Sequence, residues 1–319
     1  MTAYAELRAQ LETLTTEAFR PELAEIDRLS TLEIARTMNA EDATVPAAVA
    51  AQLPRIADAV DAIAARMARG GRLVYAGAGT AGRMGVLDAS ECPPTFNTDP
   101  ADVVGLIAGG PSAMVKAVEG AEDSKELAAE DLTALALTAE DTVIGVSASG
   151  RTPYAIGAVE FARTRGALTV GLSCNADSAL AAAADHGIEV VVGPELLTGS
   201  TRLKAGTAQK LVLNLISTIT MIRLGKTYGN LMVDMRSSNE KLRARARRIV
   251  ALATGAPDEE IEAALAATGG EVKDAILVVL GGVGGPRAAE LLAASQGHLR
   301  AALAEARAEA RADARAQTR

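Results

Sequence analysis

Apolar positions in the first part of the chain recur at helical spacing. One helix is expected to begin after Ser30, a suitable N-cap, because Glu33 lies three residues later and can complete a capping box. A second helix is expected over Val45–Arg69, and Gly70-Gly71 ends it. Residues 1–70 are therefore predicted to form an N-terminal helical segment.

Beyond residue 70, short runs that are apolar throughout alternate with helical stretches. Strands that are apolar on both faces and alternate with helices indicate a parallel sheet covered on both sides. We therefore predict an α/β fold with a doubly wound, mostly parallel sheet of five strands, within residues 71–236. Ligands of such sheets bind at the carboxyl ends of the strands. The five expected strands are residues 72–77, 103–108, 142–146, 168–172 and 188–192.

The last third of the chain reads as helical. Ser200–Arg223 is expected to be one long helix, apolar over so wide a face that it suits a core or an oligomer interface. Residues 237–300 are predicted to form a small C-terminal unit, with a basic linker helix first and three helices after it. The tail, residues 301–319, is rich in Ala, Glu, Arg and Asp, so either a single helix or disorder is expected.

Composition excludes several classes of protein. The chain has 2 His, 2 Cys and no Trp, and only 2% of its residues are aromatic. These numbers are too small for a disulfide-stapled scaffold, a Cys/His zinc site or a base-stacking nucleic-acid module. Chemistry must therefore fall to carboxylates, hydroxyls, amides, lysines and arginines.

The charge and the termini narrow the class further. The formal net charge is −8 and the pI about 5.1, which argues against binding to nucleic acid or to anionic membranes. The first residues lack the pattern of a signal peptide, and no apolar run approaches the ~20 residues of a membrane span. We expect a soluble, cytoplasmic protein with a small-molecule ligand.

Two loops after predicted strands carry the residue types of an anion site. The first, Gly77–Arg83, is a glycine-rich turn into a helix, whose backbone N–H groups can hold an anion. No acid ends the second strand, so binding of NAD is not favoured. The second loop, Ser147–Pro153, offers three hydroxyls, although Ser149 or Thr152 could also be an ordinary N-cap. Their density favours a phosphate site, and the lack of a Walker motif argues against nucleotide hydrolysis.

Several strings of this sequence resemble the N-acetylmuramic acid 6-phosphate etherases, which have the sugar-isomerase (SIS) fold. They are GAGTAGR (77–83), LDASECPPT (87–95), VEGAED (118–123), SASGRTP (147–153) and KAGTAQK (204–210). The ECPPT string is specific to the etherases within this superfamily. The resemblance covers roughly residues 26–300, and residues 253–280 resemble the small ubiquitin-associated-like helical module of these enzymes.

The resemblance implies a carbon–oxygen lyase that removes D-lactate from N-acetylmuramic acid 6-phosphate during recycling of cell-wall sugars. It also implies a cytoplasmic homodimer without metal or other cofactor. Glu91 would be the proton donor and Glu122 the second catalytic acid. Together with the hydroxyl density, the resemblance indicates that the substrate is bound by Gly79, Thr80, Arg83, Ser90, Ser147, Ser149, Gly150, Thr152 and Lys204.

Two rival functions remain open. SIS domains also serve as phosphosugar sensors without catalysis, and the pair Glu91 and Glu122 is the feature that favours an enzyme. An aldose–ketose isomerase would share removal of a C2 proton, but the ECPPT string argues against it. One departure from the family is Ala81, where many members have Ser and thus one more hydroxyl.

Overall fold

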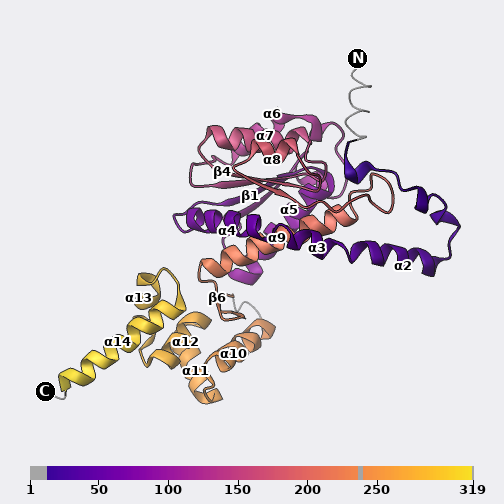
Figure 1. Cartoon of the computed structure of the whole chain (residues 1–319). Coiled ribbons are helices and arrows are strands. Elements are labelled where there is room, and N and C mark those ends of the chain that lie inside the picture. Colours follow the sequence, from indigo (N-terminus) through magenta and orange to yellow (C-terminus); the bar gives the residue numbers. More distant parts are fainter. Residues whose placement is uncertain (1–12, 236–239, 318–319) are drawn as a thin grey trace. The chain divides into compact units, whose positions relative to one another are not determined.

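The computed structural model describes residues 13–235 and 240–317 of the chain. These residues form two compact units. One contains the residues up to Ser90 together with Pro100–Thr218, and the other contains Glu91–Asp99 and the residues from Ile219 onward. Figure 1 shows the elements of both units in chain order.

The first unit opens with three 3₁₀ turns, η1 (Thr15–Glu17), η2 (Pro21–Leu23) and η3 (Ile26–Arg28). Helix α2 (Thr31–Asp42) follows, and its predicted capping box is confirmed, because Ser30 accepts from the Glu33 amide while Glu33 accepts from the Ser30 amide.

The second predicted helix is in fact two helices, α3 (Val45–Ala50) and α4 (Leu53–Met67). Pro54 lies in the first turn of α4, where its missing N–H costs nothing. In the middle of a continuous helix the same proline would remove a hydrogen bond and clash with the preceding turn, so the helix breaks before it.

The five predicted strands form one parallel sheet in the order β2-β1-β3-β4-β5, which confirms the predicted fold class. Gly77 at the end of β1 pairs with Ile107 of β2 and Val146 of β3, so three strands end at the same edge. The last strand stops at Glu189, earlier than the sequence indicated. The strands are β1 (Leu73–Gly77), β2 (Val103–Ile107), β3 (Thr142–Val146), β4 (Leu168–Ser173) and β5 (His186–Glu189).

Helices cover both faces of this sheet, so the doubly wound arrangement is confirmed. Figure 1 shows α6, α7 and α8 on one side and α4, α5 and α9 on the other. Strands β1, β3 and β4 are buried throughout, which explains their unbroken apolar sequences. The remaining helices of this layer are α5 (Gly79–Phe96), α6 (Lys125–Ala134), α7 (Pro153–Thr164), α8 (Ala179–Ala183) and α9 (Lys204–Arg223).

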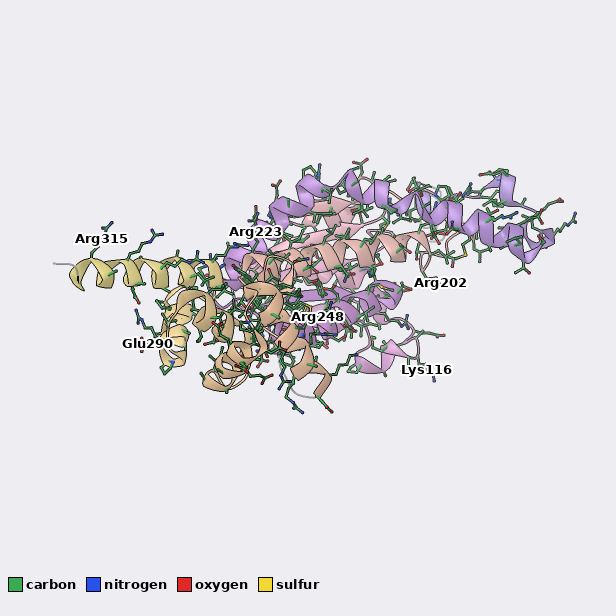
Figure 2. All side chains as sticks on the ribbon, turned by 90° about the horizontal axis from the view of Figure 1, so that it is seen from below. Lys116, Arg202, Arg223, Arg248, Glu290 and Arg315 are labelled. Carbon is green, nitrogen blue, oxygen red and sulfur yellow. The ribbon has the colours of Figure 1, made fainter. Side chains whose placement is uncertain are left out.

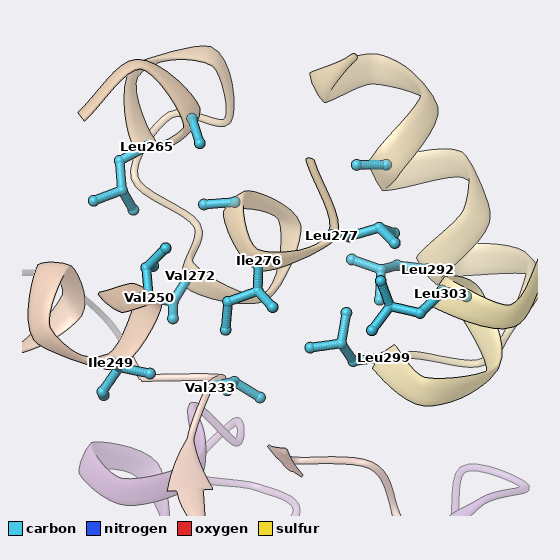
Figure 3. Packing of buried hydrophobic residues seen from close by; sticks show 14 of the residues in the cluster. Val233, Ile249, Val250, Leu265, Val272, Ile276, Leu277, Leu292, Leu299 and Leu303 are labelled. Carbon is cyan, nitrogen blue, oxygen red and sulfur yellow. The ribbon is translucent and has the colours of Figure 1, made fainter. Parts of the chain in front are cut away.

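The second unit consists of a small hairpin, β6 (Thr227–Tyr228) with β7 (Leu231–Met232), and five helices. Its core gathers Val250, Ile276, Leu292 and Leu303 from four of these helices (Figure 3). Charged side chains such as Glu290 and Arg315 point away from it (Figure 2). The helices are α10 (Glu240–Thr254), α11 (Asp258–Ala267), α12 (Val272–Gly281), α13 (Gly285–Ala294) and α14 (Leu299–Gln317).

Helix α14 occupies most of the predicted low-complexity tail. Its first turns belong to the core of the unit, because Leu299, Ala302, Leu303 and Ala306 are buried. Among the described residues, no single helix has both the length and the hydropathy of a membrane span; α12 and α13 reach them only as a pair bent by 105°.

Candidate active site

The glycine-rich turn brings the start of α5 directly onto the end of β1. Gly79 has φ +54°, a conformation that L side chains rarely adopt. A Cβ on Gly82 would lie 2.6 Å from the Gly77 carbonyl oxygen, so only glycine permits this close approach. The turn thereby places the amino end of α5, with its unpaired N–H groups, at the carboxyl edge of the sheet.

The hydroxyls of the second loop bond to one another beside this helix end. Ser147 is 2% exposed, and its Oγ lies 2.7 Å from Thr152 Oγ1 and 3.2 Å from Ser149 Oγ. The Gly150 amide donates to the same Ser147 Oγ at 3.0 Å. Thr152 is the N-cap residue of α7, yet its side chain makes no capping bond. The ordinary N-cap interpretation therefore does not describe Thr152, whose hydroxyl faces the cluster instead.

Both loops line one cavity of about 580 Å³ at the carboxyl edge of the sheet. Its lining brings together five of the predicted substrate-binding residues, namely Gly79, Thr80, Ser147, Ser149 and Thr152. Hydroxyls and amides at two helix starts can hold a phosphate dianion without a basic surface. We call this arrangement of hydroxyls and helix starts the cradle.

Glu122 reaches this cavity from the segment between β2 and α6. It lies on the 3₁₀ turn η5 (Ala121–Asp123), which follows Gly120 with φ +75°. Glu122 is exposed and lines both the cradle cavity and a smaller one of about 200 Å³. A carboxylate at this position can exchange protons with a substrate whose phosphate lies in the cradle.

Arg83 lines the smaller cavity from the second turn of α5. Its Nε donates to the Met114 carbonyl at 2.9 Å and its Nη2 to the Ala113 carbonyl at 2.8 Å. These carbonyls end the 3₁₀ turn η4 (Pro111–Met114), so Arg83 fixes the loop that leads to Glu122.

Glu91 and Ser90 lie within helix α5. The helix continues through Pro93 and Pro94 to Phe96, and both Glu91 and Ser90 are exposed. Glu91 lines neither cavity and lies about 18 Å along the helix axis from Gly79. The Ser90 hydroxyl donates to the Leu87 carbonyl at 2.8 Å. Glu91 belongs to the second compact unit, whereas Glu122 belongs to the first.

A buried carboxylate that the sequence did not single out fixes the rotation of α5. Asp88 accepts from Tyr75 Oη at 2.7 Å, from Asn214 Nδ2 at 2.6 Å and from Ser217 Oγ at 3.1 Å. These donors belong to β1 and α9, so Asp88 ties α5 to both.

Lys204 lines neither cavity and forms a salt bridge. Its Nζ lies 2.8 Å from Glu41, which also binds Arg20 at 2.7 Å. Burial alone would raise the pKa of Glu41, but the hydrogen bonds from Arg20 and Lys204 outweigh this and hold the pKa below its usual range. The backbone N–H groups at the start of α9 also have a partner within the protein, because the buried Glu195 accepts from the amides of Lys204 and Ala205.

The loop after β4 has a structural role. Asn175 binds the side chains of Thr15 and Thr16, at 2.9 Å and 3.0 Å, and so holds the N-terminal segment that contributes Glu17 to the cradle cavity. Burial, followed by the charge of Glu195, raises the pKa of the Cys174 thiol to about 12. Cys174 is therefore an inert thiol at neutral pH.

Gln209 is a cavity residue that was not among the predicted substrate-binding residues. It is 1% exposed, it lines the cradle cavity, and its buried Nε2 has no hydrogen-bond partner in the described part of the chain. An unpaired buried amide costs free energy, and a ligand oxygen is the partner that this cavity would supply. No cluster of three His, Cys, Asp or Glu residues suited to a metal ion occurs in residues 13–235 or 240–317.

Comparisons with known protein families and with curated proteins agree with one another. The profile described as glucokinase regulatory protein N-terminal SIS domain matches residues 55–163, and the SIS domain profile matches residues 118–219. A curated relative from Streptomyces avermitilis, named N-acetylmuramic acid 6-phosphate etherase, is 83% identical over 306 residues, which are 96% of this chain and 98% of the relative. One of the same name from Streptomyces coelicolor is 80% identical over 303 residues, covering 95% and 97%.

Among solved structures, a phosphoheptose isomerase from Francisella tularensis is 18% identical, with a TM-score of 0.45. The likeness covers 61% of this chain and 98% of the isomerase.

Proposed function

The chain belongs to the N-acetylmuramic acid 6-phosphate etherase family, and we propose that it splits N-acetylmuramic acid 6-phosphate into N-acetylglucosamine 6-phosphate and D-lactate. The observation that carries this proposal is that Glu122 and the Ser147, Ser149 and Thr152 cluster line one cavity. A phosphate end and a proton-transfer group thus lie within reach of one small sugar. No metal or other cofactor is part of the proposed reaction.

The proposed mechanism is an elimination followed by hydration. Opening of the sugar ring exposes an aldehyde at C1, which makes the proton on C2 acidic. Glu122 removes that proton, and the C3–O bond breaks as Glu91 donates a proton to the departing lactate oxygen. Water then adds to the double bond, with its oxygen at C3 and a proton at C2. One carboxyl must be protonated while the other is ionised, and each transfer contributes roughly 10²–10⁴-fold.

We further propose that the enzyme is a homodimer in which Glu91 of a second copy completes the site. Glu91 is not among the described residues that line the two cavities, which supports a donor supplied by another copy. Helix α2 supports association, because none of its residues is buried and Leu32 is 58% exposed. We place the reaction in the cytoplasm as part of this proposal, for recycling of cell-wall sugars.

The assignment of roles is tested with Glu91→Ala and Glu122→Gln. We expect Glu91→Ala to release no D-lactate but to exchange the C2 proton of the substrate with deuterium from solvent, because the base is intact. Glu122→Gln should lose both reactions. Full release of D-lactate by Glu91→Ala would show that this glutamate is not the proton donor.

The second-copy contribution is tested by mixing the two inactive variants after unfolding and refolding them together. A hybrid dimer then has one site with both intact glutamates, so about a quarter of wild-type activity should return if chains pair at random. Each variant refolded alone is the control. If Glu91 acted on its own chain, every site of the hybrid would carry one substitution and no activity would return.

A second candidate function is a phosphosugar sensor without catalysis. The match to the glucokinase regulatory protein SIS domain favours it, since that name describes a regulatory protein. Incubation of the purified protein with N-acetylmuramic acid 6-phosphate separates the two functions: free D-lactate indicates the etherase, and binding without D-lactate indicates the sensor.

A further inference from the structure

We propose that the smaller cavity around Arg83 is the binding site for the lactyl carboxylate of the substrate. This inference rests on the proposed function, because it assigns one end of the proposed substrate to one part of the site. The substrate has two anionic ends, a phosphate at C6 and a carboxylate on the ether at C3. The structure has two adjoining cavities, which share Ala78, Gly79 and Glu122.

The position of Glu122 decides which end lies where. It lines both cavities, so a substrate that spans them has its central carbons beside this carboxylate. With the phosphate in the hydroxyl cradle, C2 and C3 pass Glu122 and the substituent on C3 enters the smaller cavity. This order of groups is the one that removal of the C2 proton requires.

The chemistry of the smaller cavity matches a lactyl group. Its walls include Ala113, Ala117 and Val118, which suit a methyl group, and Arg83 is the one cation among its described lining residues. A volume of about 200 Å³ has ample room for a substituent of a few atoms, since one water needs about 10–15 Å³. An acetamido group would match the apolar wall but has no use for a cation.

Arg83 is held in position to bind an anion. Its Nε and Nη2 donate to two backbone carbonyls, which fixes the plane of the guanidinium. Its Nη1 makes no hydrogen bond, and Arg83 forms no ion pair with any residue in the described ranges. A planar guanidinium with a free N–H edge is a directed donor for a carboxylate.

Glu119 and Glu122 also line this cavity, and both are exposed at its rim. Their negative charges oppose a second carboxylate, so binding depends on direct hydrogen bonds from Arg83. The proposal therefore predicts a second effect, opposite in direction to that of removing Arg83. Neutralising Glu119 should improve binding of the acid substrate and leave binding of a neutral analogue unaffected.

The test compares two substrates, the natural acid and an analogue in which the lactyl carboxylate is a carboxamide. We expect wild type to prefer the acid in kcat/KM, and Arg83→Met to lose roughly 10- to 100-fold of that preference. Glu119→Gln should lower KM for the acid only. A merely structural role of Arg83 would lower kcat/KM for both substrates equally and leave the preference unchanged, which would overturn the proposal.

Arg151→Met is the matched control, because Arg151 lines the cradle cavity and not the smaller one. It should change the rates for acid and amide by the same factor. Arg83→Lys keeps the charge and covers the case in which Arg83→Met does not fold, and it should retain part of the preference. Failure of wild type to release D-lactate would instead contradict the proposed function itself, so the two failures are distinguishable.

Discussion

The polar side chains that line the cradle cavity differ in how well the sequence predicts their role. Ser147, Ser149 and Thr152 stand within six residues after an apolar run, so their density predicted a phosphate site. Gln209 stands in the second turn of the long helix α9, where a glutamine is ordinarily solvated. Only the fold shows that its amide is buried against the cavity without a partner.

Substitution of Gln209 should therefore affect stability and function in opposite directions. Gln209→Leu removes an unpaired buried amide, so we expect the free energy of unfolding without ligand to stay equal or to rise by about 1 kcal/mol. We expect kcat/KM to fall roughly 10-fold, because a ligand oxygen loses its donor. Thermal unfolding and steady-state kinetics measure the two effects.

Gln52→Leu is the matched control for this prediction. Gln52 also has a buried unpaired atom, its Oε1, but it lines neither cavity. Its substitution should leave kcat/KM unchanged. A lower melting temperature of Gln209→Leu with unchanged kinetics would mean that Gln209 supports the fold and not the ligand.

At the scale of elements, the sheet was predictable because its three central strands are buried on both faces and so read as unbroken apolar runs. The boundaries of α5 were not, because two prolines normally end a helix. Here they fall in its last turns, and the helix carries Glu91 away from the edge of the sheet.

The contact between Asp141 and Arg72 is a second feature that the sequence did not predict. Asp141 precedes β3 and accepts from the Arg72 backbone and side chain before β1.

Asp141 should make the stability of the sheet depend on pH. Burial alone would raise its pKa, but hydrogen bonds from Arg72 and Thr138 outweigh this and lower the pKa. A carboxyl with a lowered folded-state pKa stabilises the fold above its unfolded pKa of about 3.9, and this contribution is lost as the pH falls further.

Asp141→Asn should therefore lower the free energy of unfolding by about 2–3 kcal/mol at pH 7, because it leaves Arg72 without its counter-charge. Urea unfolding between pH 7 and pH 3 measures the difference from wild type. That difference should be constant above about pH 5 and narrow below pH 4. A difference independent of pH over this whole range would show that the charge of Asp141 contributes nothing.

At the scale of the whole molecule, the chain forms two compact units with different contents. The α/β unit holds both cavities, and the helical unit has a core of its own. The core of the second unit includes the first turns of the last helix, α14. Its composition suggested a tail, yet Leu299 and Leu303 belong to the core.

Two truncations test the buried first turns and the exposed last turns of α14 separately. Removal of residues 298–319 exposes the facing side chains of α12 and α13, and we expect rapid proteolysis of the helical unit with loss of several kcal/mol of stability. Removal of residues 308–319 should have little effect, since residues 308–312 are exposed and the ion pair of Arg287 with Glu309 lies at the surface. Equal protease resistance of both truncated proteins would contradict a core role for the first turns of α14.

The sequence by itself determined the sheet and the family, and it predicted the cradle hydroxyls and the two glutamates, because apolar periodicity and contiguous strings are local properties. Tertiary structure alone decided that Glu122 adjoins two cavities, that Lys204 pairs with Glu41, and that Gln209 and Asp88 are buried. Each of these depends on which side of a helix meets another segment far away in the chain. That choice follows from packing of the whole core, which no short stretch of sequence contains.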